Sequence, residues 1–421
     1  MTKRRPFSNV FYGWWITWAF FVILTYSAGT FVYGTPAIVN PVREDLGWSV
    51  GAVALAFSLQ RLQNGLLAPV VGQIVDRYGA RGPIFFGTVL MSSSFIVLGF
   101  TSSLWMFYIG FLMGSVGLSF QSPSVGFSTV THWFKRKRAQ ALSIVVAGGG
   151  FAGILVPAVA FLIDNLGWRH ALFVMAGGFW IFSLPILLII KPRPEPYGYQ
   201  VDGGPPPQAT PGVATTPAED EPEVSFKQAM RSRSFWFLAL GFACIQLSIT
   251  PVLSLSFAAL EDKGYSRNVI GWVIVAFTLV SVCARFFIGW LADRANKRYI
   301  YTVCAVLQIT GLFCFVAIGS AWTLVPFIIT FGAGYGGTLP LRPAMQADYF
   351  GRKSFGAING MILTVLSPAA VASPAIVGLL HNATDSYAPG FILLAGVSGL
   401  GIPLILLSKP KKTQKASQAM A

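Results

Sequence analysis

Long apolar runs recur along the whole chain, separated by short segments that carry most of its charges. Each run has about 20 residues, the length that an α-helix needs to cross the hydrocarbon core of a bilayer. The pattern predicts twelve helices, at 13–38, 50–74, 83–101, 105–130, 140–163, 168–190, 234–258, 268–291, 299–319, 322–346, 355–379 and 387–408. The predicted fold class is an all-α membrane protein with twelve transmembrane helices.

The composition points the same way. Of the 421 residues, 54% are hydrophobic and only 11% are charged, whereas a soluble globular protein has about 25% charged residues. All four cysteines lie in apolar runs and lack the spacing of a metal site, so we expect them to be small core residues. We expect no metal and no cofactor.

The basic residues are divided unevenly between the two predicted sides of the membrane. Most of the 30 Lys and Arg lie in the N-terminal tail, the loops after even-numbered helices and the C-terminal tail, which the positive-inside rule assigns to the cytoplasm. Only Arg43, Arg169, Lys263 and Arg267 lie opposite. The net charge of +15 therefore reflects topology and anionic lipid rather than nucleic acid. Both termini are expected in the cytoplasm, and the protein in the cytoplasmic membrane.

The chain divides into two similar halves. The Pro-, Gly- and acid-rich segment 191–233 cannot form a core, so it predicts a cytoplasmic linker that ends in a short surface helix, "SFKQAMRSR". Residues 1–190 and 234–408 then form two six-helix bundles, and 409–421 a cytoplasmic tail. "GQIVDRYGAR" pairs with "GWLADRANKR", and "HWFKRKRAQALSIV" with "DYFGRKSFGAINGMI", at nearly the same offset. This indicates a duplicated six-helix unit.

The first of these motifs resembles the G-x-x-x-D-R-x-G-x-R loop of the major facilitator superfamily. Its residues here are Gly72, Asp76, Arg77, Gly79 and Arg81, and the second copy keeps Asp293, Arg294 and Arg298. Such a glycine lets two helices approach, and the aspartate faces the positive end of a neighbouring helix. Gly79 suits a tight turn, where the second copy has Asn296, expected to be left-handed.

This resemblance implies two pseudo-symmetric six-helix bundles. It also implies that the two loops act as gating latches, which open and close during alternating access. The alternative is that they are ordinary polar loops whose charges are set by topology.

Arg285 lies near the centre of the predicted helix 268–291, where a charge costs roughly 2.5–3.5 kcal/mol. It precedes Asp293 by eight residues, or about 12 Å of helix. The stretches "FYGWW", "REDLGW" and "ADYFGRKSFGAINGMI" resemble the oxalate:formate antiporter and monocarboxylate transporter branch of the superfamily. In that branch an arginine at this place binds the substrate carboxylate, which suits a guanidinium. The resemblance implies this role for Arg285; a structural charge is the alternative.

Arg61 lies in the predicted helix 50–74, about 22 Å from its cytoplasmic end. Asn64 shares its face, and Gln60 lies four residues before Asn64. This group is either a second anion contact or a charge that holds the helix to a neighbour.

Arg342 lies between Pro340 and Pro343, so we expect an irregular helix and a role in an inner gate or in structure rather than in cargo binding. Tyr26 and Tyr33 are seven residues apart and are predicted to share a helix face. They either reach the cavity or pack against a neighbouring helix.

The departures from the branch bear on the cargo. The oxalate exchanger has a lysine in the eleventh helix, whereas 355–379 contains no Lys or Arg. One fixed central cation favours a monoanion, unless Arg61 joins it. The animal proton-coupled carriers have an aspartate where this chain has Ser281. No Asp, Glu or His lies in the interior of a predicted helix, and His170 lies at the end of one. Exchange or facilitated diffusion is therefore simpler than proton symport, although a proton can travel on the substrate carboxylate.

The favoured prediction is a secondary transporter that moves a small organic monocarboxylate across the cytoplasmic membrane by alternating access. Exchange, facilitated diffusion and proton-linked transport all stay open. One alternative is an exporter of larger amphipathic acids or drugs, and another is a membrane receptor that moves no cargo. We see no Ser–His–Asp, metal or phosphate-loop pattern, so we do not expect an enzyme. The expected partners are a small carboxylate and membrane lipid; a monomer is what the resemblance implies.

Overall fold

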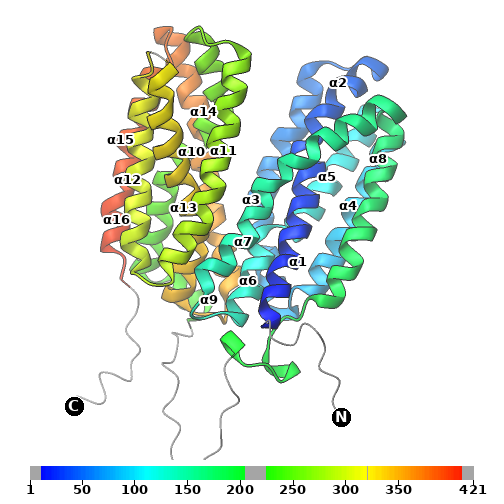
Figure 1. Ribbon diagram of the computed structural model, residues 1–421. Coiled ribbons are helices and arrows are strands. Elements are labelled where there is room, and N and C mark those ends of the chain that lie inside the picture. The colour runs from blue at the N-terminus through cyan, green and yellow to red at the C-terminus, as the bar shows by residue number, and fades with distance from the viewer. Residues whose placement is uncertain (1–10, 204–223, 320, 410–421) are drawn as a thin grey trace, which may run out of the picture. The chain divides into compact units, whose positions relative to one another are not determined.

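The computed structural model describes residues 11–203, 224–319 and 321–409, and within these ranges it contains helices and no strand (Figure 1). This confirms the all-α fold class. The α-helices are α1 (Tyr12–Ser27), α2 (Thr35–Leu46), α3 (Val50–Tyr78), α4 (Arg81–Gly99), α5 (Leu104–Phe120), α6 (Pro123–Trp133), α7 (Arg138–Phe151), α8 (Val156–Ile189), α9 (Phe226–Met230), α10 (Arg233–Asp262), α11 (Arg267–Ala292), α12 (Lys297–Val316), α13 (Leu324–Phe350), α14 (Phe355–Thr384), α15 (Ala388–Gly399) and α16 (Gly401–Leu407).

The helices group into two compact units. The first consists of Met1–Pro217 together with Phe355–Gly360, and the second of Ala218–Ser354 together with Met361–Ala421. The first unit therefore holds α1 to α8 and the first residues of α14. The second holds α9 to α13, the rest of α14, α15 and α16.

Ten helical segments of the described chain are long and apolar enough to cross a membrane. Two differences explain why ten segments are found where twelve spans were predicted. The segment Arg138–Ile189 contains two of the predicted spans, and α3 is not among the ten. The chain is thus an integral membrane protein by its helices, and the count of twelve stays a prediction.

Local chemistry explains where the helices break. Gly167, inside α8, has a φ of 75°, a conformation that glycine adopts without steric cost, and it divides the fifth predicted span from the sixth. The fourth predicted span is two helices, because Pro123 lacks an N–H group and opens α6 after Ser122. The predicted surface helix is confirmed as α9. Ser225 and Gln228 form a capping box at its N-terminus.

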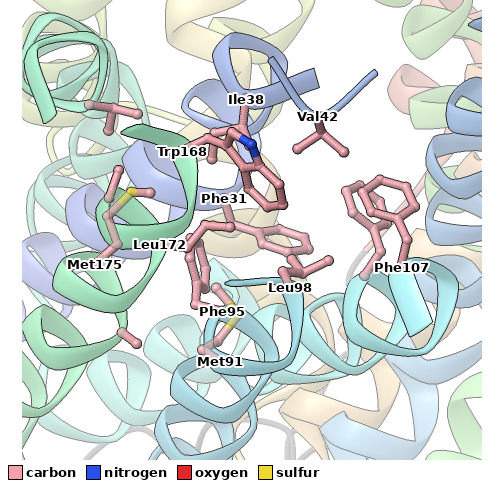
Figure 2. Packing of buried hydrophobic residues seen from close by; sticks show 14 of the residues in the cluster. Phe31, Ile38, Val42, Met91, Phe95, Leu98, Phe107, Trp168, Leu172 and Met175 are labelled. Atoms are coloured by element: carbon pink, nitrogen blue, oxygen red, sulfur yellow. The ribbon is translucent and has the colours of Figure 1, made fainter. Parts of the chain in front are cut away.

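The core of the first unit is built from aromatic and aliphatic side chains of several helices. Phe31, Phe95, Phe107 and Trp168 come from the turn after α1 and from α4, α5 and α8, and Figure 2 shows them turned toward one another. Ile38 and Val42 of α2 extend this cluster. Such packing fixes the helices of the unit relative to each other.

The second unit has its own core. It gathers buried side chains of α10 to α15, among them Leu312, Phe315, Phe327, Phe331 and Phe391. Phe315 packs edge-on against Phe391, with ring centres 5.0 Å apart. Because this core is separate from the first, each unit holds its own helices rigidly.

The start of the predicted linker packs against the first unit. The Lys191 ammonium lies over the rings of Tyr12, Tyr197 and Tyr199, at 4.2, 4.6 and 4.9 Å from their centres. Further along, the Asp202 carboxylate accepts hydrogen bonds from the backbone N–H groups of Lys135 and Arg136, at 3.0 and 2.9 Å. We call residues 191–203 the strap. Its composition predicted a linker, and these specific contacts order it.

Candidate functional site

Arg285 is a buried cation within the second unit. It lies on the face of α11 that also buries Ser281 and Gly289, and only 5% of its surface is exposed. Its Nη2 donates a hydrogen bond to the Ser281 hydroxyl, at 3.3 Å. This contact orients the guanidinium. A buried charge is costly unless partners or solvent stabilise it.

α13 supplies an aromatic ring to the same place. The Cζ atom of Arg285 lies 5.9 Å from the centre of the Tyr335 ring, at the outer limit of a cation–π contact. Next to it, a Cβ atom on Gly336 would stand 2.2 Å from the backbone oxygen of Ser281. Only glycine permits this close approach of α11 and α13. The run "GAGYGG" at 332–337 is the sequence signal for it, and our sequence analysis missed it.

The first of the two repeated loop motifs places its aspartate, Asp76, at the start of α14. The Asp76 carboxylate accepts hydrogen bonds from the backbone N–H groups of Gly356 and Ala357, each at 2.8 Å, and from the Ser128 hydroxyl at 3.3 Å. The N–H groups at the first turn of a helix have no partner within the helix and carry a partial positive charge. All these residues belong to the first unit.

Glycines make this contact possible. A Cβ atom on Gly72 would lie 2.0 Å from the carbonyl oxygen of Gly356, and one on Gly360 would lie 2.3 Å from that of Ala68. The spacing of Gly356 and Gly360 is the Gly-x-x-x-Gly pattern of close helix packing, a signal that we did not use.

The remaining residues of the first loop have separate places. Gly79 ends α3 with a φ of 76° and packs under Pro192. The exposed Arg77 lies over the ring of Tyr78, at 5.3 Å, and Arg81 is exposed at the start of α4.

The second loop motif, within the second unit, makes different hydrogen bonds from the first. Asp293 ends α11, and Arg294 donates to the backbone oxygen of Trp290 at 3.0 Å. Arg298 donates to the backbone oxygens of Leu406 and Ser408, at 3.2 and 2.9 Å, and so caps the C-terminus of α16.

The expectation of a left-handed turn at Asn296 is wrong. Its φ is −67°, and its side chain caps α12 by accepting from the N–H group of Arg298. Asparagine can adopt a left-handed turn or cap a helix. Here it caps α12, because the first N–H groups of the helix need an acceptor.

The whole chain can now be compared with known proteins. A family model described as Major Facilitator Superfamily matches residues 19–264 and 236–420. The chain belongs to the Major Facilitator Superfamily. The two matched ranges overlap at 236–264, and this membership identifies the chain as a transporter-family protein.

Individual relatives are more distant. Monocarboxylate transporter 12 of Rattus norvegicus is 26% identical over 376 residues, covering 84% of this chain and 76% of the relative. Agnestins efflux protein AgnL12 of Paecilomyces divaricatus is 25% identical over 354 residues, covering 81% and 74%.

Two solved structures share the fold. The human organic anion transporter MFSD10 (TETRAN) has a TM-score of 0.69 at 14% identity, covering 96% of this chain and all of that one. The Fucose:proton symporter FucP of E. coli has a TM-score of 0.69 at 12% identity, covering 94% and 98%.

In this Major Facilitator Superfamily chain, the predicted site residues of α3 have different surroundings. Asn64 accepts hydrogen bonds from the hydroxyls of Ser115 and Ser119 on α5, at 3.1 and 3.0 Å. Gln60 is partly buried in α3, whereas the side chain of Arg61 lies outside the described part. The predicted roles of Gln60 and Arg61 therefore stay predictions.

Tyr26 and Tyr33 lie in different surroundings. The Tyr26 hydroxyl donates to the backbone oxygen of Met175 at 2.8 Å, and its ring packs against Phe179, so it takes the packing role that the sequence left open. A π-helical turn, Ala28–Tyr33, separates the two tyrosines, and Tyr33 is 48% exposed. Because such a turn holds one extra residue, it rotates the later residues by about 100° around the helix axis. The seven-residue spacing therefore does not place the two tyrosines on one face.

Arg342 lies in α13 of the second unit, two turns after Tyr335. The helix is continuous from Leu324 to Phe350 although it contains Pro340 and Pro343, so the expected irregular segment is not seen. Thus Arg342 lies in a regular helix of the same unit as Arg285, whereas the two prolines had predicted an irregular one.

Proposed function

We propose that the chain is a secondary transporter that moves a small organic monocarboxylate anion across the cytoplasmic membrane by alternating access. The single observation that carries this proposal is the buried guanidinium of Arg285 in an apolar helix, next to a neutral serine. A carboxylate is the natural partner for that group, because its two oxygens match the planar N–H fork of a guanidinium. Relatives named monocarboxylate transporters, 26% identical, support this choice.

The residues around Arg285 suit binding that is firm but reversible. Ser281 engages one guanidinium nitrogen, so the plane of the group is held when cargo arrives. The Tyr335 ring offers an apolar wall on the same side chain. A small carboxylate has an apolar body behind its charged end, and these two contacts fit both parts. We assign Arg285 the role of carboxylate contact and Ser281 that of a positioning residue.

The gating role of the loops follows from alternating access. The Asp76 carboxylate is bonded to the first turn of α14, and these bonds have to break if that turn moves during the cycle. We propose that Gly72, Asp76 and Gly79 form one gating latch. Asp293, Arg294 and Arg298 form the corresponding loop of the second half. Both termini are placed in the cytoplasm by the positive-inside rule.

An exporter of larger amphipathic acids is the second candidate. The observation that favours it is the relative named as an efflux protein, which is 25% identical over 354 residues. The two candidates differ in cargo size rather than in the use of Arg285, so a comparison of cargo separates them.

The test is uptake into liposomes that contain the purified protein. Radiolabelled pyruvate, lactate, formate and a long-chain fatty acid are offered to wild type, Arg285→Ala and Arg285→Lys. Arg267→Ala is the matched control, because Arg267 begins the same helix and is 80% exposed. We expect short acids to be taken up by wild type and the control but not by Arg285→Ala. Normal uptake by folded Arg285→Ala contradicts the proposal, and uptake of the long acid alone favours the exporter.

A further inference from the structure

Three helix faces of small and polar side chains meet at the first turn of α14, within the first unit. Residues three or four positions apart share a helix face. The faces consist of Ala68, Gly72 and Asp76 on α3, Ser124 and Ser128 on α6, and Gly356, Asn359 and Gly360 on α14. A Cβ atom on either Gly72 or Gly360 would overlap the facing backbone. The helices therefore approach closely enough to exclude water from the polar groups between them.

Asn359 is one of these polar groups, and only 1% of its surface is exposed. Its Nδ2 atom donates a hydrogen bond to the Ser124 hydroxyl, at 2.8 Å. Its Oδ1 atom is buried and has no hydrogen-bond partner in the described part of the chain. Turning the amide around would only exchange its two ends. One end of the Asn359 amide is thus unpaired in either orientation.

The two ends of this amide act in opposite directions on the contact between the helices. The bond to Ser124 ties α14 to α6, next to the bonds that Asp76 accepts from α14. The unpaired oxygen has lost its hydration and recovers it when the helices part. The cost of burying one unpaired polar group exceeds the net gain from one neutral hydrogen bond. Asn359 therefore weakens the contact that Asp76 strengthens.

We propose that Asn359 is a gating residue that weakens the latch at Asp76, so that the first turn of α14 is released in each transport cycle. The latch is engaged when Asp76 accepts from the N–H groups of Gly356 and Ala357. The inference rests on the proposed function, because it takes the movement of this turn during alternating access as given. Without the unpaired amide, the engaged state would be more stable and its release slower.

The N–H groups of Gly356 and Ala357 report whether the latch is engaged. Asp76 is their acceptor, and the first turn of a helix offers them no other within the helix. Hydrogen–deuterium exchange of the purified protein, followed by mass spectrometry of the peptide that contains 355–360, measures their protection.

Asn359→Leu keeps a branched side chain and removes both polar ends. One buried unpaired group corresponds to roughly a tenfold change in the ratio of engaged to released protein. We therefore expect exchange at Gly356 and Ala357 to slow by about tenfold. Pyruvate uptake into liposomes should also slow several-fold, because the latch is released less often.

Two control variants separate this effect from general changes in stability. Ser373 also has a buried oxygen without a hydrogen-bond partner among the described residues, and it lies about 21 Å further along α14. Ser373→Ala should leave exchange at Gly356 and Ala357 as in wild type. Ser124→Ala removes the partner of Asn359, so both ends of the amide are unpaired and exchange should be faster than in wild type.

The outcomes distinguish this inference from the proposed function. Slower exchange and slower uptake in Asn359→Leu support the inference. Unchanged or faster exchange overturns it, and so does slower exchange with uptake as in wild type. If Asn359→Leu does not fold, the less bulky Asn359→Val carries the same expectations. If wild type takes up no pyruvate, the proposed function fails, whereas the exchange rates still decide whether Asn359 weakens the contact of α14.

Discussion

Replacing Gly72 by alanine should destabilise the protein by separating α3 from the first turn of α14. The new methyl group would stand 2.0 Å from the oxygen and 2.3 Å from the carbon of the Gly356 carbonyl. Ordinary contact between such atoms is about 3.5 Å, so the helices must part by roughly 1–1.5 Å. The two 2.8 Å hydrogen bonds from Gly356 and Ala357 to Asp76 would then stretch beyond the normal range.

Three terms add up to the expected change in the free energy of unfolding of Gly72→Ala. Overpacking costs about 1–3 kcal/mol, and each lost charge-assisted hydrogen bond costs about 1.5–3 kcal/mol. The higher helix propensity of alanine returns about 0.5–1 kcal/mol. We therefore expect the free energy of unfolding to fall by at least about 2 kcal/mol.

The assay is thermal unfolding of purified protein in detergent, and Gly51→Ala is the matched control. Gly51 lies in the same helix, and a Cβ atom there meets nothing within 4 Å. Gly72→Ala should melt several degrees below wild type, whereas Gly51→Ala should not. The double variant with Asp76→Asn should lose less stability than the sum of the two single variants, because both changes weaken the same hydrogen bonds. Equal melting of the two alanine variants, or additive effects in the double variant, would refute this reasoning.

Three further predictions concern other parts of the chain. Ser281→Asp should lower pyruvate uptake at neutral pH and restore it under an inward proton gradient, because an ionised carboxylate there pairs with Arg285 and its protonation releases the arginine; uptake as in wild type without a gradient would contradict this. Asp202→Ala should free the strap and speed chymotryptic cleavage after Tyr197 and Tyr199, since two hydrogen bonds from backbone N–H groups are lost; an unchanged cleavage rate would show that the tyrosine contacts of Lys191 suffice. Unlabelled pyruvate inside liposomes should stimulate uptake without a pH gradient, because no Asp, Glu or His lies in the interior of a predicted span; uptake that requires the gradient would mean proton coupling.

Apolar runs and loop motifs predicted much of this fold from sequence. Hydrophobic length identifies membrane helices because every backbone polar group in lipid has to be bonded within its own helix. The break at Gly167 lies in the predicted gap between the fifth and sixth spans, whereas the break at Pro123 was missed. Proline is tolerated in membrane helices, and only the surrounding packing decides whether the helix ends there.

The sequence identified the charged residue of the candidate site, Arg285, but not the residues that surround it. Arg285 stood out because a charge in an apolar run is rare. Its contact with Tyr335 depends on the glycine-lined crossing of two helices that are far apart in sequence. The prediction that Tyr26 and Tyr33 share a helix face failed for a different reason. It assumed an α-helical period, and a π-helical turn changes that period.

The most direct test of the central claim is equilibrium binding of radiolabelled pyruvate to the purified protein in detergent, which does not depend on coupling or direction. Wild type and Arg267→Ala should bind saturably and with the same affinity. Arg285→Ala should lose at least about tenfold in affinity, as expected when a charge-assisted contact is removed, and Arg285→Lys should recover part of it. Unchanged affinity in folded Arg285→Ala would show that Arg285 is a structural charge and that the carboxylate site lies elsewhere.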